Sequence, residues 1–118
     1  MATKEIAADL VSMCKAGKFN ECGEKYWADD VLSVEPMGDN AQARGKAAVK
    51  AKGEAFMKGH EIHGCEVEGP YLNGDEFVVG FKMDMTAKES GQRHTMAETA
   101  LYTIRNGKIA EERFFYGG

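Results

Sequence analysis

The stretch F-V-V-G-F-K-M-D-M, residues 77–85, decides the fold, because large apolar side chains recur along it at every second position. A period of two places Phe77 and each alternate residue after it on one face of a β-strand. Gly80, Lys82 and Asp84 fall on the opposite face. The pattern therefore predicts a strand with one face packed inward and the other in water.

This strand is predicted to be one of four in the second half of the chain. The turn dipeptides Asn73-Gly74, Ser90-Gly91 and Asn106-Gly107 separate long strand patterns, and Asn-Gly is the strongest hairpin signal. The predicted strands are 61–71, 75–89, 92–105 and 108–117. Consecutive strands joined by hairpins predict an antiparallel meander.

The first half of the chain has helical periodicity. Ile6, Leu10 and Cys14 recur on one face of a predicted helix, with Thr3 as its N-cap and Gly17 as its C-cap. The remaining predicted elements are a helix over 18–28, a strand over 31–36 and a helix over 44–58. Their predicted buried residues are Phe19, Cys22, Tyr26 and Trp27 in the first of these helices, and Val49, Phe56 and Met57 in the second.

This order of elements predicts an α+β fold. Three N-terminal helices pack in the concave face of a curved, mainly antiparallel sheet, which gives a cone-shaped α+β barrel. The seven methionines have flexible side chains, so the interior of such a cone readily leaves a pocket. Without a linker or repeat, the 118 residues predict one domain spanning 1–118.

Composition excludes several classes of function. The 15 basic and 19 acidic residues give a net charge of −4, which disfavours nucleic-acid binding because that needs a basic surface. No apolar run approaches the ~18 residues of a membrane span. The opening M-A-T-K-E-I-A-A-D-L has acidic residues where a signal peptide would continue its apolar region. A cytoplasmic protein without a nucleic-acid or membrane partner is expected.

Neither a metal nor a cofactor is expected. Cys14, Cys22 and Cys65 are odd in number and lack a C-x-x-C pattern, which favours buried thiols over disulfides or a zinc site. His60 and His63 are three residues apart, whereas the zinc-protease helix needs a spacing of four.

The predicted helix over 44–58 is basic, with Glu54 as its single acid. Its basic residues are Arg44, Lys46, Lys50, Lys52 and Lys58. Binding of anions or membranes is one interpretation, but no stripe of Trp or bulky aliphatic residues supports insertion. A solvated outer face is the preferred interpretation.

Several sequence runs resemble the steroid-isomerase and SnoaL-like branch of the nuclear transport factor 2-like superfamily. They are C-K-A-G-K-F-N (14–20), Y-W-A-D-D-V-L-S-V-E-P-M-G (26–38), R-G-K-A-A-V (44–49) and N-G-K-I-A-E-E-R-F-F-Y (106–116). The resemblance implies an apolar pocket at the open end of the cone, and a homodimer. It specifies function poorly, because the superfamily includes isomerases, polyketide cyclases, dehydratases, epoxide hydrolases and non-catalytic domains.

The resemblance implies Glu35 as a general base. In ketosteroid isomerases, A-D-D and four further residues precede a catalytic carboxylate and a proline, and here Ala28-Asp29-Asp30 precedes Glu35-Pro36 by the same spacing. A carboxylate at the rim of an apolar pocket suits this role because desolvation disfavours its charged form. The alternative is a surface glutamate at the end of a strand.

The isomerase oxyanion hole, a tyrosine and a protonated aspartic acid, has no counterpart here. The matching positions are Leu10 and Ala100, and removal of one such donor commonly lowers the rate roughly 10²–10³-fold. Ketosteroid isomerisation itself is therefore not expected. Glu98 shares a strand face with Ala100. It is predicted either to act as an acid or hydrogen-bond donor, or to pair with a lysine or arginine across the sheet.

Further residues are predicted to bind a substrate near Glu35. The resemblance gives Trp27, Glu112, Phe114 and Tyr116, and strand parity adds Met83, Met96 and Tyr102. Such stripes are more typical of a plain core, and only their convergence toward Glu35 favours a ligand pocket. His94 has the parity of Glu98, but its place near a turn favours a solvent-facing position.

The leading hypothesis is a cofactor-independent isomerase, cyclase or dehydratase. It would move a proton on an apolar carbonyl compound, with Glu35 as general base and Glu98 as second catalytic carboxyl. The alternative is a non-catalytic ligand-binding or dimerisation module with the same pocket, which the missing oxyanion donors favour. The expected partners are a small apolar molecule and a second copy of the chain in a homodimer.

Overall fold

The computed structural model describes residues 2–38 and 41–117, which form three helices and six strands. In chain order they are α1 (Thr3–Lys15), α2 (Phe19–Tyr26), β1 (Trp27–Val34), β2 (Gln42–Arg44), α3 (Lys46–Gly59), β3 (His60–Asn73), β4 (Glu76–Ala87), β5 (Arg93–Arg105) and β6 (Lys108–Phe115). None of these helices is long and apolar enough to cross a membrane.

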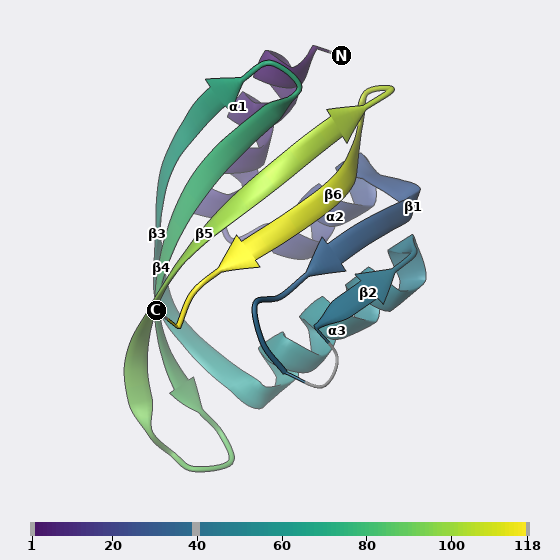
Figure 1. Cartoon of the computed structure of the whole chain (residues 1–118). Helices are drawn as coiled ribbons and strands as arrows, with labels where there is room; N and C mark the ends of the chain where they lie inside the picture. The colour runs from purple at the N-terminus through teal and green to yellow at the C-terminus, as the bar shows by residue number, and fades with distance from the viewer. Residues whose placement is uncertain (1, 39–40, 118) are drawn as a thin grey trace.

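The strands form one curved sheet in the order β2-β1-β6-β5-β4-β3. The consecutive strands from β3 to β6 pair antiparallel, which confirms the predicted meander. The long strands bend, and the three helices lie on one side of the sheet (Figure 1). The predicted α+β architecture is confirmed. One feature not predicted is the parallel pairing of β1 with β6, which makes the sheet mixed.

The predicted turn dipeptides lie at the sheet's hairpins. Asn106 and Gly107 join β5 to β6 with φ of 52° and 73°. Two successive residues with positive φ are typical of the type I′ turn, whose twist matches that of the flanking strands. Gly74, between β3 and β4, and Gly91, between β4 and β5, also have positive φ.

The core lies between the helices and the inner face of the sheet. The alternation that predicted β4 is confirmed: Phe77, Val79 and Phe81 are buried in one cluster with Ile6 and Leu10 of α1. Of the cysteines, Cys14 and Cys22 are buried as predicted, whereas Cys65 is only partly covered because it lies on the edge strand β3.

The boundaries near the amino terminus differ from the predictions. Helix α1 already includes Thr3, and its N-cap is Ala2, so the predicted N-cap was wrong. Gly17 follows the C-cap with φ of 76° and donates its N–H to the carbonyl of Cys14 at 3.0 Å, so it ends the helix as predicted. Helix α2 ends at Tyr26, and the chain turns at once into β1.

The third helix begins later than predicted. Arg44 belongs to the short edge strand β2, where it lies opposite Leu32 of β1. Gly45 then adopts φ of 96° and donates its N–H to the carbonyl of Val31 at 2.8 Å. A left-handed conformation suits glycine, so the turn that holds β2 against β1 delays the helix until Lys46.

Candidate functional site

The sheet and helices line a partly open cavity of about 340 Å³. This volume is at the lower end of the range usual for small-molecule sites. The cavity brings together every residue predicted for the pocket: Trp27, Glu35, Met83, Met96, Glu98, Tyr102, Glu112, Phe114 and Tyr116. Most of the other lining side chains are apolar, and they include Leu10, Val49 and Phe56.

Strand register places the cavity residues on one face. Met83 lies opposite Met96, and Tyr102 lies opposite Glu112. Glu98 lies opposite Phe81 of β4, and none of the ion pairs within residues 2–38 and 41–117 includes Glu98, so the alternative of a cross-strand ion pair was wrong. Residues directly opposite on an antiparallel pair point to the same side, so Glu98 faces the cavity with its apolar neighbour.

Glu35 follows the last residue of β1 and presents its two carboxylate oxygens differently. Its backbone N–H donates to the carbonyl of Ala41 at 2.6 Å, which fixes the chain as it leaves the strand. Its Oε1 accepts a hydrogen bond from Lys52 Nζ at 3.2 Å. Its Oε2 is buried and has no hydrogen-bond partner within residues 2–38 and 41–117. A buried polar atom without a partner is costly, and such atoms are typical of functional sites.

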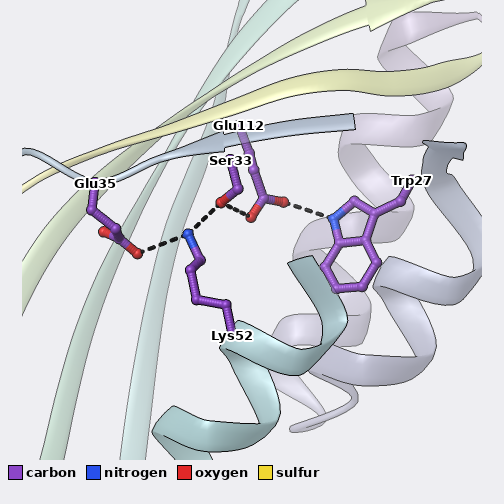
Figure 2. A network of polar contacts seen from close by, with 5 residues as sticks. All are labelled: Trp27, Ser33, Glu35, Lys52 and Glu112. Carbon is purple, nitrogen blue, oxygen red and sulfur yellow. Dashed lines mark hydrogen bonds and ion pairs between the residues drawn. The ribbon is translucent and has the colours of Figure 1, made fainter. Parts of the chain in front are cut away.

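A chain of hydrogen bonds runs from Glu35 into the core (Figure 2). Lys52 Nζ also donates to Ser33 Oγ at 2.5 Å. The Ser33 hydroxyl donates to Glu112 Oε2 at 2.9 Å, and Trp27 Nε1 donates to Glu112 Oε1 at 2.7 Å. The buried Glu112 carboxyl therefore accepts on both oxygens and fixes Ser33, which in turn fixes the Lys52 ammonium beside Glu35.

Lys52 corrects the prediction that the basic side chains of 44–58 form a solvated outer face. Lys46 and Lys50 do pair with Glu24 outside the cavity, but the Lys52 side chain turns inward and is only 25% exposed. Helical spacing explains this position, because Lys52 lies three residues after Val49 and four before Phe56, both of which line the cavity. The helical spacing of Lys52 from Val49 and Phe56 could have predicted that it faces the cavity. The prediction relied instead on the number of basic residues in the helix, and so it missed Lys52.

The buried carboxyls have altered proton affinities. Burial raises the pKa of Glu98 to about 7, and the charges of Glu35 and Glu112 add to this shift while Lys52 opposes it. Burial also raises the pKa of Glu112, against the hydrogen bonds from Trp27 and Ser33. Glu98 is thus close to half-protonated near neutral pH and can donate or accept a proton there.

This shift makes stability depend on pH. Because the pKa of Glu98 is about 7 in the folded chain against 4.5 for an ordinary glutamate, the folded state binds more protons between these values. Stability should therefore fall as pH rises through this window and level off above it. The Glu98→Gln variant should show a smaller decrease in Tm from about pH 5 to about pH 8 than the wild type, measured by circular dichroism. The exposed Glu54→Gln on α3 is the control, and a decrease equal to the wild type in Glu98→Gln would contradict the assignment.

Tyr116 is a further polar group at the cavity. Burial, the charge of Glu35 and an interaction of the hydroxyl with the Glu35 carboxylate raise the pKa of the Tyr116 hydroxyl to about 12, so the hydroxyl stays protonated at neutral pH. His94 is exposed and lies outside the cavity lining, as its place near the turn predicted. His60 and His63 begin β3, where they bond to the Phe56 carbonyl at 2.9 Å and to Thr86 Oγ1 at 2.7 Å.

The position of the Trp27 side chain depends on Gly23, which lies one helical turn earlier. Trp27 is the first residue of β1, whereas the prediction placed it in the helix over 18–28. A Cβ atom at Gly23 would collide with the Trp27 ring, so only glycine allows the indole to lie against α2 while its N–H reaches Glu112. A glycine within an eight-residue helix is destabilising, and this close approach accounts for it.

The sequence and fold of this chain are similar to those of known proteins. Residues 1–116 match the family model of the SnoaL-like domain. The chain belongs to the SnoaL-like family. A solved structure from Mesorhizobium loti, assigned provisionally as a SnoaL-like polyketide cyclase, is 49% identical to this SnoaL-like chain. Its TM-score is 0.96, over 98% of this chain and 100% of the other.

More distant solved structures share the fold. A provisionally assigned isomerase from Bacillus subtilis has a TM-score of 0.81 at 17% identity, covering 99% of this chain and 90% of its own. A protein of unknown function with a cystatin-like fold, from Xanthomonas campestris, has a TM-score of 0.80 at 22% identity. The match covers 100% of this chain and 92% of the other. No curated protein sequence matches this SnoaL-like chain.

Proposed function

We propose that the chain is a cofactor-independent enzyme of the cyclase or isomerase type that moves a proton on an apolar carbonyl compound, with Glu35 as general base. The observation that carries this proposal is the asymmetry of the Glu35 carboxylate. Lys52 holds Oε1, while Oε2 is buried at the cavity wall and has no hydrogen-bond partner among the residues that the structure describes. An oriented carboxylate with one free oxygen has the geometry that proton abstraction needs. The similarity to the Mesorhizobium loti protein supports the reaction class.

In the proposed reaction, Glu35 Oε2 takes a proton from the carbon next to the carbonyl. The C–H bonding electrons form a carbon–carbon double bond, and the carbonyl oxygen gains negative charge. Glu98 lines the same cavity and is partly protonated near pH 7, so it donates a hydrogen bond or proton to the substrate. General acid–base catalysis of this kind contributes roughly 10²–10⁴ in rate.

The cavity lining favours a compact apolar substrate. Met83, Met96 and Phe114 provide its apolar wall on the sheet, and the volume of about 340 Å³ suits a small ring system. The alternative, a non-catalytic binding module, is favoured by Leu10 and Ala100, which offer no donor to a developing oxyanion. The two functions differ in turnover and not in ligand affinity.

Deuterium exchange into 2-tetralone, a small apolar ketone, tests the proposal. The wild-type protein in deuterated buffer should accelerate exchange next to the carbonyl by at least about 10² over buffer alone, as followed by proton NMR. If 2-tetralone binds, as shown by saturation-transfer NMR, but exchanges at the buffer rate, the binding module is the correct function.

A further inference from the structure

Enolate formation requires a group that stabilises the negative charge on the substrate oxygen. In enzymes of this kind, removing one such donor commonly costs roughly 10²–10³ in rate. Leu10 and Ala100 cannot supply it, and Glu98 supplies a donor only while it is protonated. The Lys52 ammonium is a further donor, and it lies at the cavity wall beside Glu35.

We propose that Lys52 is a catalytic residue that binds the substrate carbonyl oxygen and stabilises the enolate. The substrate is then a carbonyl compound whose acidic C–H lies on the carbon directly bonded to the carbonyl group. This inference rests on the proposed role of Glu35 as general base.

The distance between the two groups matches such a substrate. Lys52 Nζ lies 3.2 Å from Glu35 Oε1, and Oε2, the proposed base, belongs to the same carboxylate. In a ketone, the oxygen and the neighbouring carbon are about 2.4 Å apart. One substrate can therefore place its oxygen against the ammonium and its C–H against the carboxylate at the same time, which is the orientation that favours reaction.

The hydrogen-bonding capacity of Lys52 also fits this role. Two of its three N–H groups are used by Ser33 and Glu35, and the structure gives the third no hydrogen-bond partner among the residues it describes. Ser33 is itself fixed by Glu112, and the Phe114 ring centre lies 5.4 Å from Nζ. The ammonium is thus held in place before a substrate enters, so little reorganisation is needed when charge develops.

The charges balance through the step. Before reaction, the positive Lys52 is compensated by the negative Glu35. When Glu35 accepts the proton it becomes neutral, and the negative charge moves to the substrate oxygen, where Lys52 compensates it again. No net charge is created in the cavity, which avoids the large cost of an uncompensated charge at low dielectric. Return of the proton from Glu35 to carbon restores the starting state.

The test compares Lys52→Met, Lys52→Arg and Lys50→Met in the 2-tetralone exchange assay. Lys52→Met keeps the length of the side chain but removes its charge, so kcat should fall by at least about 10². Lys52→Arg keeps the charge and should retain part of the activity. Lys50→Met, which removes a lysine that pairs with the exposed Glu24, should match the wild type. Wild-type kcat in Lys52→Met would overturn the inference without affecting the proposed function.

A binding measurement separates oxyanion stabilisation from a structural role and does not depend on turnover. The probes are 4-nitrophenolate, which carries an anionic oxygen, and nitrobenzene, which has a similar shape without that charge. Lys52→Met should weaken binding of 4-nitrophenolate at least about tenfold and change nitrobenzene affinity less than about threefold. Equal losses for both probes, or no binding of 4-nitrophenolate to the wild type, would overturn the inference. Absence of exchange by the wild type would instead overturn the proposed function, and the two probes would still test Lys52.

Discussion

Replacement of Glu35 by glutamine should lower the rate of 2-tetralone exchange by about 10²–10⁴. Glutamine keeps the shape of the side chain, and its amide oxygen can still accept the hydrogen bond from Lys52. It cannot accept a proton from carbon, so the chemical step loses its base. The effect should fall on kcat, with the affinity for nitrobenzene nearly unchanged, because the apolar wall of the cavity is intact. NMR exchange rates over a range of ketone concentrations separate the two parameters.

The matched control for this substitution is Glu54→Gln. Glu54 lies on the exposed side of α3, so the same chemical change there removes one surface charge and leaves the cavity unaltered. Its exchange rate should equal that of the wild type. A Glu35→Gln protein with a kcat within about threefold of the wild type would exclude Glu35 as the base. A loss confined to nitrobenzene affinity would show that Glu35 shapes the cavity instead.

Replacement of Phe77 by alanine should lower the free energy of unfolding by about 3–5 kcal/mol. Phe77 is fully buried, and its ring stacks on that of Tyr102 with centres 5.1 Å apart. Loss of the ring leaves a void beneath a residue that lines the cavity. Domains are commonly stable by only about 5–15 kcal/mol, so this single change removes a large part of the total. Urea denaturation followed by circular dichroism measures it.

Tyr71→Ala provides the comparison for Phe77→Ala. Tyr71 is 57% exposed on the edge strand β3, so its truncation removes an aromatic ring without opening the core. Its cost should stay below about 1 kcal/mol. Similar losses of stability in the two variants would contradict the assignment of Phe77 to the core.

The meander could be predicted because its information is local. Alternation within each strand sets which side chains face inward, and strand parity correctly predicted that Met83, Met96 and Tyr102 line the cavity. The turn at Asn106-Gly107 needs positive φ at two adjacent residues, and asparagine and glycine are the residue types that adopt it most readily. Features that depend on period and turn chemistry therefore followed from the sequence.

The features that were missed depend on partners distant in the chain. Nothing in β1 indicates that it pairs in parallel with β6, since a short strand pattern carries no information about its neighbour. The same pairing stabilises the early start of β1 and so draws Trp27 out of the predicted helix. Lys52 was missed for a different reason, because its charge favoured solvent while its helical phase favoured the cavity, and the buried carboxyls that compensate it come from other strands.

The parallel contact between β1 and β6 also has a consequence for the order of folding. Ser33 lies opposite Glu112, so the two halves of the polar network are 79 residues apart in the chain. The hairpins from β3 to β6 close short loops, whereas docking of β1 onto β6 must close a long one, which is slower. On a ribosome, β6 emerges after every other element, and until then β1 and β5 present unpaired edges that can aggregate. The ammonium of Lys52 thus reaches its place only when the whole sheet has assembled.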